Sequence, residues 1–317
     1  MENHRKLIKF GTSSYVVSIP NDWIKKNKLE KGDVVFLSQN PKNELIISVG
    51  GISGDQQKTS IEIVVDGKDL SRVKREIIAS YLNNHNIITL KGKNLEKYAQ
   101  TIRQTVHNMM GMEIVEENYR AIIAKDFMNL HEVVIEEMIR KVDNIARSMI
   151  EDIPQILEKD ISESIVQRDD QINRMVFLLT RVMKQTLNDP SHTNKKNVLS
   201  TSKIIDMWEV IFHIEKIADF LKRIARNMSR IRQRKEVLND LFVVYARIKK
   251  LYWDTFKAYY TQDGQTSLGL SEYKRILADD CNKLHEKYWR VRYAPIIIED
   301  YKNVISSIHN IGRRVYS

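Results

Sequence analysis

The sequence has a single cysteine, Cys281, among its 317 residues. One cysteine excludes an intrachain disulfide and is typical of a chain that stays in a reducing compartment. No apolar run approaches the roughly 20 residues that a membrane-spanning helix needs. The first residues are polar and basic, without the apolar segment of a secretion signal. We therefore expect a cytoplasmic protein without a transmembrane segment.

Motifs for catalysis are also missing from the sequence. In residues 56–126, Gly92 and Gly111 stand alone, so this part has no glycine-rich loop to cradle a phosphate. The 8 histidines are scattered, and no pair has ligand spacing with a third donor. Because no Ser/His/Asp, Cys/His or P-loop arrangement is recognisable, we do not expect an enzyme.

Composition indicates a globular chain with enough apolar residues for sizeable cores. Hydrophobic residues make up 42% of the sequence, and its length suggests two or three domains. Lysine and arginine total 51 against 41 aspartate and glutamate, which gives a net charge of +10. This excess attracts nucleic acid or an anionic membrane, although so mixed a balance does not identify the partner.

The first fifty residues have the pattern of two short hairpins around one helical turn. A turn at 11–14 separates apolar runs at 7–10 and 15–19, and Pro20 suits the first position of a helix. Strands at 34–37 and 45–49 flank a turn at 40–43. A unit of this size buries little core alone, so we expect a partner chain.

The segment SIPNDWIKKNKLEKGD, with the turn before it and the hairpin after it, resembles the AbrB/SpoVT family of transcription regulators. The resemblance covers residues 3–50 and implies a swapped-hairpin β-barrel that two chains build together as a homodimer. Such a barrel presents basic residues to double-stranded DNA. In the domain 1–50 the expected DNA-binding residues are Arg5, Lys6, Lys9, Ser13, Ser14, Lys25 and Lys26.

A polar segment with three glycines at 50–55 predicts a linker. After it, the sequence predicts a small α/β domain over 56–126, whose expected role is that of a spacer or dimerisation module. The pattern indicates strands at 61–65 and 87–90, helices at 70–82 and 95–110, and a strand pair or one long strand at 113–125.

From residue 127 onward helical periodicity dominates, and no glycine occurs between Gly111 and Gly264. Pro154, Pro190 and Pro295 separate the periodic segments. We predict six helices, at about 128–152, 162–187, 197–232, 236–262, 270–290 and 296–315. Their order suggests a duplicated three-helix unit. The third helix has a continuous apolar seam that predicts core, namely Met207, Val210, Ile214, Ile217, Leu221, Ile224, Met228 and Ile231.

Glu215 and Asp219 lie four residues apart on the third helix, so their carboxylates share one face with Trp208 and Phe212. Two explanations stay open for this pair of like charges. A divalent or ferric ion held between helices offsets their repulsion. Alternatively, Asp219 pairs with Arg223 at i,i+4, Glu215 is solvated, and no metal is bound.

The segments QRDDQINRMVFLLTRVMK and HIEKIADFLKRIARN resemble the PhoU family of phosphate-uptake regulators. The resemblance covers about 125–317 and implies an all-α domain of two three-helix repeats, which we place at 127–317. With the AbrB-like start, the chain is similar to archaeal-type regulators of α+β multidomain fold. The resemblance also implies an acidic motif that binds iron, zinc or manganese. This motif falls on Glu215 and Asp219, with Asp169 and Asp170 as companions.

The sequence departs from that metal-binding pattern at several positions. Asn173 stands four residues after Asp169, where the motif has an aspartate. In the second repeat, Ser306 and Asn310 occupy the positions of the acidic pair. A complete second cluster is therefore not expected.

A basic run at 220–235 contains no acidic residue. It is either a solvated helix end or a surface for an acidic partner or DNA. Two functions remain open. The first is a dimeric DNA-binding transcriptional regulator of phosphate uptake, which senses phosphate status or a partner through its helical domain. The second is an adaptor that docks on a phosphate ABC transporter or signalling protein, in which the barrel serves only for dimerisation.

Overall fold

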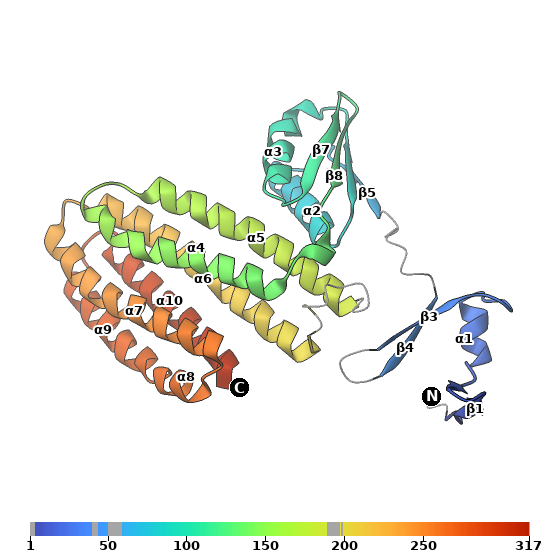
Figure 1. Ribbon diagram of the computed structural model, residues 1–317. Coiled ribbons are helices and arrows are strands. Elements are labelled where there is room, and N and C mark those ends of the chain that lie inside the picture. Colours follow the sequence, from blue (N-terminus) through green and yellow to red (C-terminus); the bar gives the residue numbers. More distant parts are fainter. Residues whose placement is uncertain (1–3, 40–43, 50–58, 189–196, 198, 317) are drawn as a thin grey trace. The chain divides into compact units, whose positions relative to one another are not determined.

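The computed structural model describes residues 4–39, 44–49, 59–188, 197 and 199–316 (Figure 1). The chain divides into two compact units, residues 1–57 and residues 58–317, and each is described by itself. The predicted turn at 40–43 and the predicted linker at 50–55 lie outside the described residues.

The first unit consists of two antiparallel hairpins and one short helix. Gly11 occupies the turn of the first hairpin with a positive φ of 72°, a conformation that favours glycine. Pro20 lies at the N-cap of the helix and not at its first position. In chain order the elements are β1 (Ile8–Phe10), β2 (Ser14–Val16), α1 (Asn21–Lys26), β3 (Val35–Gln39) and β4 (Leu45–Val49).

The described residues of the first unit form no core of their own. No side chain whose burial is described in residues 4–49 is buried. The two hairpins form separate two-stranded sheets, so one chain does not close a barrel. Large apolar side chains are exposed on both hairpins and beside them, namely Leu7, Ile8, Phe10, Tyr15, Val16, Val17, Val34, Leu37, Leu45, Ile46 and Val49. The interleaved barrel stays a prediction.

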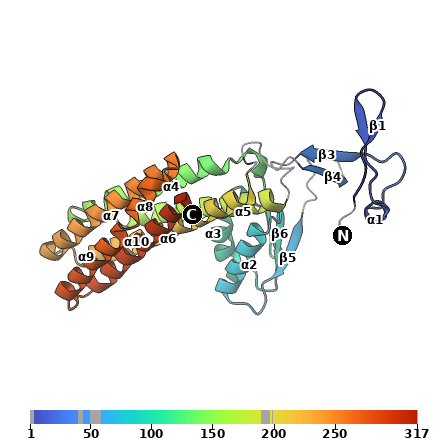
Figure 2. The same cartoon turned by 90° about the horizontal axis from the view of Figure 1, so that it is seen from below.

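The second unit begins with an α/β module, residues 59–126. Its four-stranded sheet has the order β5-β6-β8-β7, in which β5 and β6 are parallel and the other pairs antiparallel. Figures 1 and 2 show both helices on the same face of this sheet. The elements are β5 (Ser60–Val64), α2 (Leu70–Leu82), β6 (Ile87–Lys91), α3 (Glu96–His107), β7 (Met112–Glu117) and β8 (Ala121–Asp126).

The sheet of the module has one covered and one open face. Alternate residues such as Ile88 and Leu90 are fully buried against the helices, while Glu62 and Lys91 form an exposed ion pair on the other face. The strand pair predicted within 113–125 is present as the hairpin β7–β8. The module therefore has its own apolar core on one side of the sheet.

A helical bundle follows from residue 130 to residue 316. Helices α4, α5 and α6 pack on one another, as do α7, α9 and α10, and the two groups join along α6 and α10. Figure 2 shows this arrangement from below. The long helices are α4 (Ile135–Asp152), α5 (Ser162–Asn188), α6 (Thr201–Arg230), α7 (Lys235–Thr261), α9 (Tyr273–Tyr288) and α10 (Ala294–Tyr316). The predicted seam on α6 is confirmed, because all eight of its residues are buried.

One predicted helix start in the bundle is wrong, and one short helix was not predicted. The first helix begins at Ile135 and not near 128, because residues 130–132 form a 3-10 turn and Val134 is extended. The fifth is preceded by a short separate helix, α8 (Gly264–Leu270). Gln262 ends α7 in the left-handed conformation, and the Asp263 side chain then caps α8 by accepting the Thr266 N–H at 3.0 Å.

Cys281 is fully buried in the core of the bundle. Burial raises the pKa of its thiol to about 12. In the part of the chain that the structure describes, no helix is both long and apolar enough to span a membrane.

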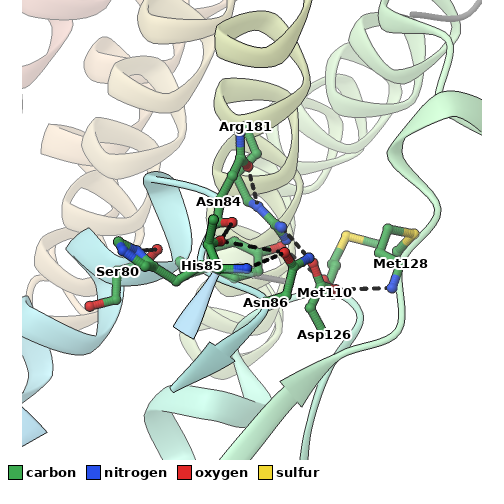
Figure 3. A network of polar contacts seen from close by, with 10 residues as sticks. Ser80, Asn84, His85, Asn86, Met110, Asp126, Met128 and Arg181 are labelled. Atoms are coloured by element: carbon green, nitrogen blue, oxygen red, sulfur yellow. Dashed lines mark hydrogen bonds and ion pairs between the residues drawn. The ribbon is translucent and has the colours of Figure 1, made fainter. Parts of the chain in front are cut away.

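A buried arginine connects the module to the bundle (Figure 3). Arg181 of α5 donates from Nη2 to Asp126 Oδ2 at 2.5 Å and from Nε to Asn84 Oδ1 at 3.0 Å. Its guanidinium lies 4.1 Å from the centroid of the Tyr81 ring. The side chains of Arg181 and Asp126 are 0% and 1% exposed, so each charge depends on the other for its compensation.

We expect Asp126→Asn to lower the free energy of unfolding by about 3 kcal/mol, because it leaves the Arg181 charge buried without a carboxylate. Urea denaturation measures this change. The matched control is Glu117→Gln, which breaks an exposed ion pair with Arg103 on the same module and should cost under about 1 kcal/mol. If the Asp126→Asn protein is as stable as this control, the Asp126 carboxylate is not the required counterion of Arg181.

Candidate functional site

The predicted DNA-binding residues are all exposed on the first unit. Lys9 and Ser14 lie on paired strands of the first hairpin, and Ser13 lies in its turn. Lys25 and Lys26 form the last turn of α1, while Arg5 and Lys6 precede β1. These cations are therefore free to approach a polyanion, although no DNA contact follows from exposure alone.

The predicted metal ligands are only partly brought together. The ammonium of Lys222 on α6 lies between two carboxylates, donating to Asp169 Oδ2 at 2.5 Å and to Asp219 Oδ1 at 2.7 Å. We call Asp169 and Asp219, joined by Lys222, the lysine-bridged acidic pair. Asp169 is buried, and burial raises its pKa even though Lys222 acts in the opposite direction. A lysine thus lies between two of the residues that the resemblance implies as metal ligands.

Glu215 and Asp170 lie outside this pair. Glu215 approaches Lys216 at 3.3 Å, and burial raises the pKa of its carboxyl. Asp170 is exposed and lines a cleft toward α2 and α3. The expectation that Glu215 is solvated is therefore only partly right, since its side chain is 21% exposed.

The predicted partner of Asp219 is also different. Arg223 does not pair with Asp219 but approaches Asp300 of α10 at 2.9 Å. Asp300 is fully buried, and burial raises its pKa to about 6. The i,i+3 partner Lys222 takes the place of the predicted i,i+4 partner, because Lys222 also reaches Asp169 on the neighbouring helix.

A resident metal does not fit these donors as they stand. Asp169 Oδ1 is buried without a hydrogen-bond partner, so one oxygen is still available as a ligand. However, among the described residues no three His, Cys, Asp or Glu side chains converge on one point. An ion that contacts both Asp169 and Asp219 has to displace the Lys222 ammonium. The metal site therefore stays a prediction.

An exposed aromatic stripe continues the same face of α6. Trp208 and Phe212 are 48% and 42% exposed, and their rings stack at a centroid distance of 5.9 Å. Ile205, one turn earlier, is 48% exposed. The sequence placed both aromatic residues on this face, and the structure shows that the described residues leave nearly half of each side chain exposed.

The basic run after Asp219 has two kinds of members. Lys222 and Arg223 form ion pairs with the buried carboxylates of Asp169 and Asp300. Arg226 and Arg234 are exposed, and Arg230 lies 5.0 Å from the centroid of the Tyr293 ring. Part of the run is therefore structural, and the rest forms a basic end of the bundle.

Comparison with known protein families finds matches to two parts of the chain. Residues 8–50 match the family described as "Antidote-toxin recognition MazE, bacterial antitoxin". Residues 135–228 match the PhoU domain. Both resemblances noted in the sequence are thereby confirmed, since the first match is to an AbrB-like domain.

The crystal structure of PhoU from Pseudomonas aeruginosa is similar over 57% of this chain and 90% of that chain, at 13% identity and a TM-score of 0.46. None of the curated proteins matches the chain.

We expect Lys222→Met to lower the free energy of unfolding by about 3 kcal/mol at pH 7, because Asp169 is left buried without its cation. Without the ammonium, the pKa of Asp169 rises further. The folded state then takes up a proton that the unfolded chain does not, so the loss should shrink as the pH is lowered toward 5. Urea denaturation at pH 7 and pH 5 measures this, with Lys216→Met as control, because Lys216 is a partly exposed lysine on the same helix.

The metal content of the purified protein distinguishes a metal ion from Lys222 as the counterion of the acidic residues. Stoichiometric iron, zinc or manganese in protein purified without chelator, lost in the Glu215→Gln, Asp219→Asn double variant, would overturn the role of Lys222 as the permanent counterion. Metal-free protein whose melting temperature ignores added metal supports it, since a ligand that binds the folded state stabilises that state.

Proposed function

We propose that this protein is a homodimeric, DNA-binding transcriptional regulator of phosphate uptake. Its AbrB-like domain binds double-stranded DNA, and its PhoU domain senses phosphate status or a partner protein. The matches to the two domain families support a regulator and not an enzyme.

The observation that carries the proposal is the missing core of the first unit. Phe10 and Leu37, on different hairpins, are 71% and 65% exposed. Each fully buried side chain of this kind contributes about 1.5–3 kcal/mol, and a single copy of this unit gains none of it. A second copy that pairs with these hairpins supplies the missing apolar surface. Dimerisation also doubles the number of basic residues that one molecule of the regulator presents to DNA.

The positive residues of this unit suit the phosphate backbone of DNA. Arg5, Lys6 and Lys9 lie within five residues of one another at the start of the first hairpin. Lysine and arginine contacts to phosphate fix a protein on the duplex without reading sequence. Serine hydroxyls at Ser13 and Ser14 add donors at the tip of the same hairpin.

The second candidate function is an adaptor that docks on a phosphate ABC transporter or a signalling protein. The exposed stripe of Ile205, Trp208 and Phe212 favours it, because aromatic residues are enriched where proteins bind one another. In that case the first unit serves only to hold two chains together. The two functions differ in whether DNA is bound.

We expect wild-type protein to sediment as a dimer at micromolar concentration and the Phe10→Asp, Leu37→Asp double variant to sediment as a monomer, because both charges enter the proposed apolar interface. The matched control is Val64→Asp, at a 49% exposed position on the module. A dimer that survives the double variant but is lost in the control would place the interface on the module instead.

Replacing Arg5, Lys6 and Lys9 with alanine should weaken DNA binding and reduce its salt dependence. Each lost phosphate contact makes the negative slope of log K against log salt shallower by about 0.9. Binding is measured by fluorescence anisotropy on a mixed-sequence duplex at several salt concentrations.

The control for this triple variant is Arg232→Ala, Arg234→Ala, Lys235→Ala, which removes the same charge from the basic end of the bundle. If only the control loses affinity, the DNA surface lies on the bundle. If the wild type does not bind DNA although it is a dimer, the adaptor function is favoured.

A further inference from the structure

A cleft of about 170 Å³ lies where the α/β module meets the bundle. Lys74 of α2 and Asn108 of α3 line one side of it, and Asp170, Asn173 and Arg174 of α5 line the other. Both sides belong to the second unit. A ligand in this cleft touches the module and the bundle at once.

Arg174 carries a buried donor without an acceptor. Its Nε is inaccessible to solvent and has no hydrogen-bond partner. An unpaired buried donor of this kind is rare in native proteins, because each one loses its hydrogen bonds to water. Asp170, one turn earlier on the same helix, also lines the cleft, but it forms no ion pair with Arg174 in the described part of the chain.

The cations of the cleft form no ion pair in the described part of the chain. Neither Lys74 nor Arg174 takes part in any of the ion pairs seen there. Phe177, which also lines the cleft, is half-buried and contributes no charge. The amide of Asn108 adds a neutral donor beside the two cations, and that of Asn173 lies 3.4 Å from Asp169 Oδ2, to which it donates. The cleft thus offers donors from three helices, and Asp170 is the one carboxylate among its lining residues.

From this geometry we propose that the cleft binds inorganic phosphate in its hydrogen-phosphate form. The guanidinium of Arg174 and the ammonium of Lys74 hold the charged oxygens, since a guanidinium fork matches the oxygens of an oxyanion. Asp170, also in the cleft, repels a fully deprotonated anion but accepts a hydrogen bond from a protonated oxygen. Hydrogen phosphate keeps such a proton near pH 7, whereas sulfate does not.

The role of phosphate as an effector rests on the proposed function. Binding of phosphate in the cleft does not depend on DNA binding. Phosphate bound here bridges α2 and α3 to α5 and so stabilises the contact between module and bundle. Phosphate binding therefore favours the conformation in which the module and the bundle form both sides of the cleft.

Isothermal titration and thermal melting of the full chain at pH 7.5 test the site, with phosphate exchanged for chloride at constant ionic strength. Wild-type protein should bind phosphate saturably and melt at a higher temperature, whereas sulfate should have at least tenfold weaker affinity. Arg174→Met should weaken phosphate binding at least tenfold. Without phosphate this variant should melt no lower than wild type, because the unpaired donor is removed.

Three further variants sharpen the test. Lys184→Met is the matched control, because Lys184 lies on the same helix, reaches Asn83 of the module at 3.2 Å and does not line the cleft. Lys74→Met should weaken phosphate binding like Arg174→Met and serves if the arginine variant does not fold. Asp170→Asn should admit sulfate, since an amide no longer repels it.

Equal phosphate binding by wild type and by both the Arg174 and Lys74 variants would overturn the proposal. So would equal effects of phosphate and sulfate on the wild type, which indicate a general salt effect. A parallel titration with phenyl phosphate distinguishes free phosphate from phosphate esters. Tighter binding of the ester than of phosphate would also overturn the proposal. DNA binding measured on the same samples separates failure of the site from failure of the proposed regulator.

Discussion

The Arg181 guanidinium is the interaction on which the second unit depends. It lies between a helix of the bundle and the last strand of the module, in a place that water does not reach. A charge in such a place is tolerated only with a carboxylate, further hydrogen bonds and an aromatic face around it, and Asp126, Asn84 and Tyr81 supply these. The module is therefore fixed by a specific polar contact beside its apolar packing, which limits how it can rotate on the bundle.

Buried charge is distributed unequally along α5. Asp169 and Arg181 have partners within 2.5 Å, and each pairs with a residue that is distant in sequence. Arg174, between them, has none for its Nε. Asp169 Oδ1 and Arg181 Nη1 are also buried without a hydrogen-bond partner, so the difference is that Arg174 forms no ion pair in the described part of the chain. This contrast distinguishes the proposed phosphate site from the structural ion pairs around it.

Periodicity was sufficient to predict most elements but not the contacts between them. The seam of α6 follows from its own spacing, and all its members are buried as expected. The bridge from Lys222 to Asp169 spans 53 residues of sequence, and the bond from Arg181 to Asp126 spans 55. A helical wheel shows only neighbours on one helix, so it favoured Arg223 as the partner of Asp219. For the same reason, Asp126 and Asp300 drew no attention in the sequence.

The position of Cys281 has a practical consequence for studying this chain. Its thiol is buried in the bundle with a pKa of about 12, so little of it is in the reactive thiolate form at neutral pH. A new cysteine on an exposed position can therefore be labelled with a fluorophore or a spin label while Cys281 stays in place. Two such labels, one on each unit, would report the distance between units in solution.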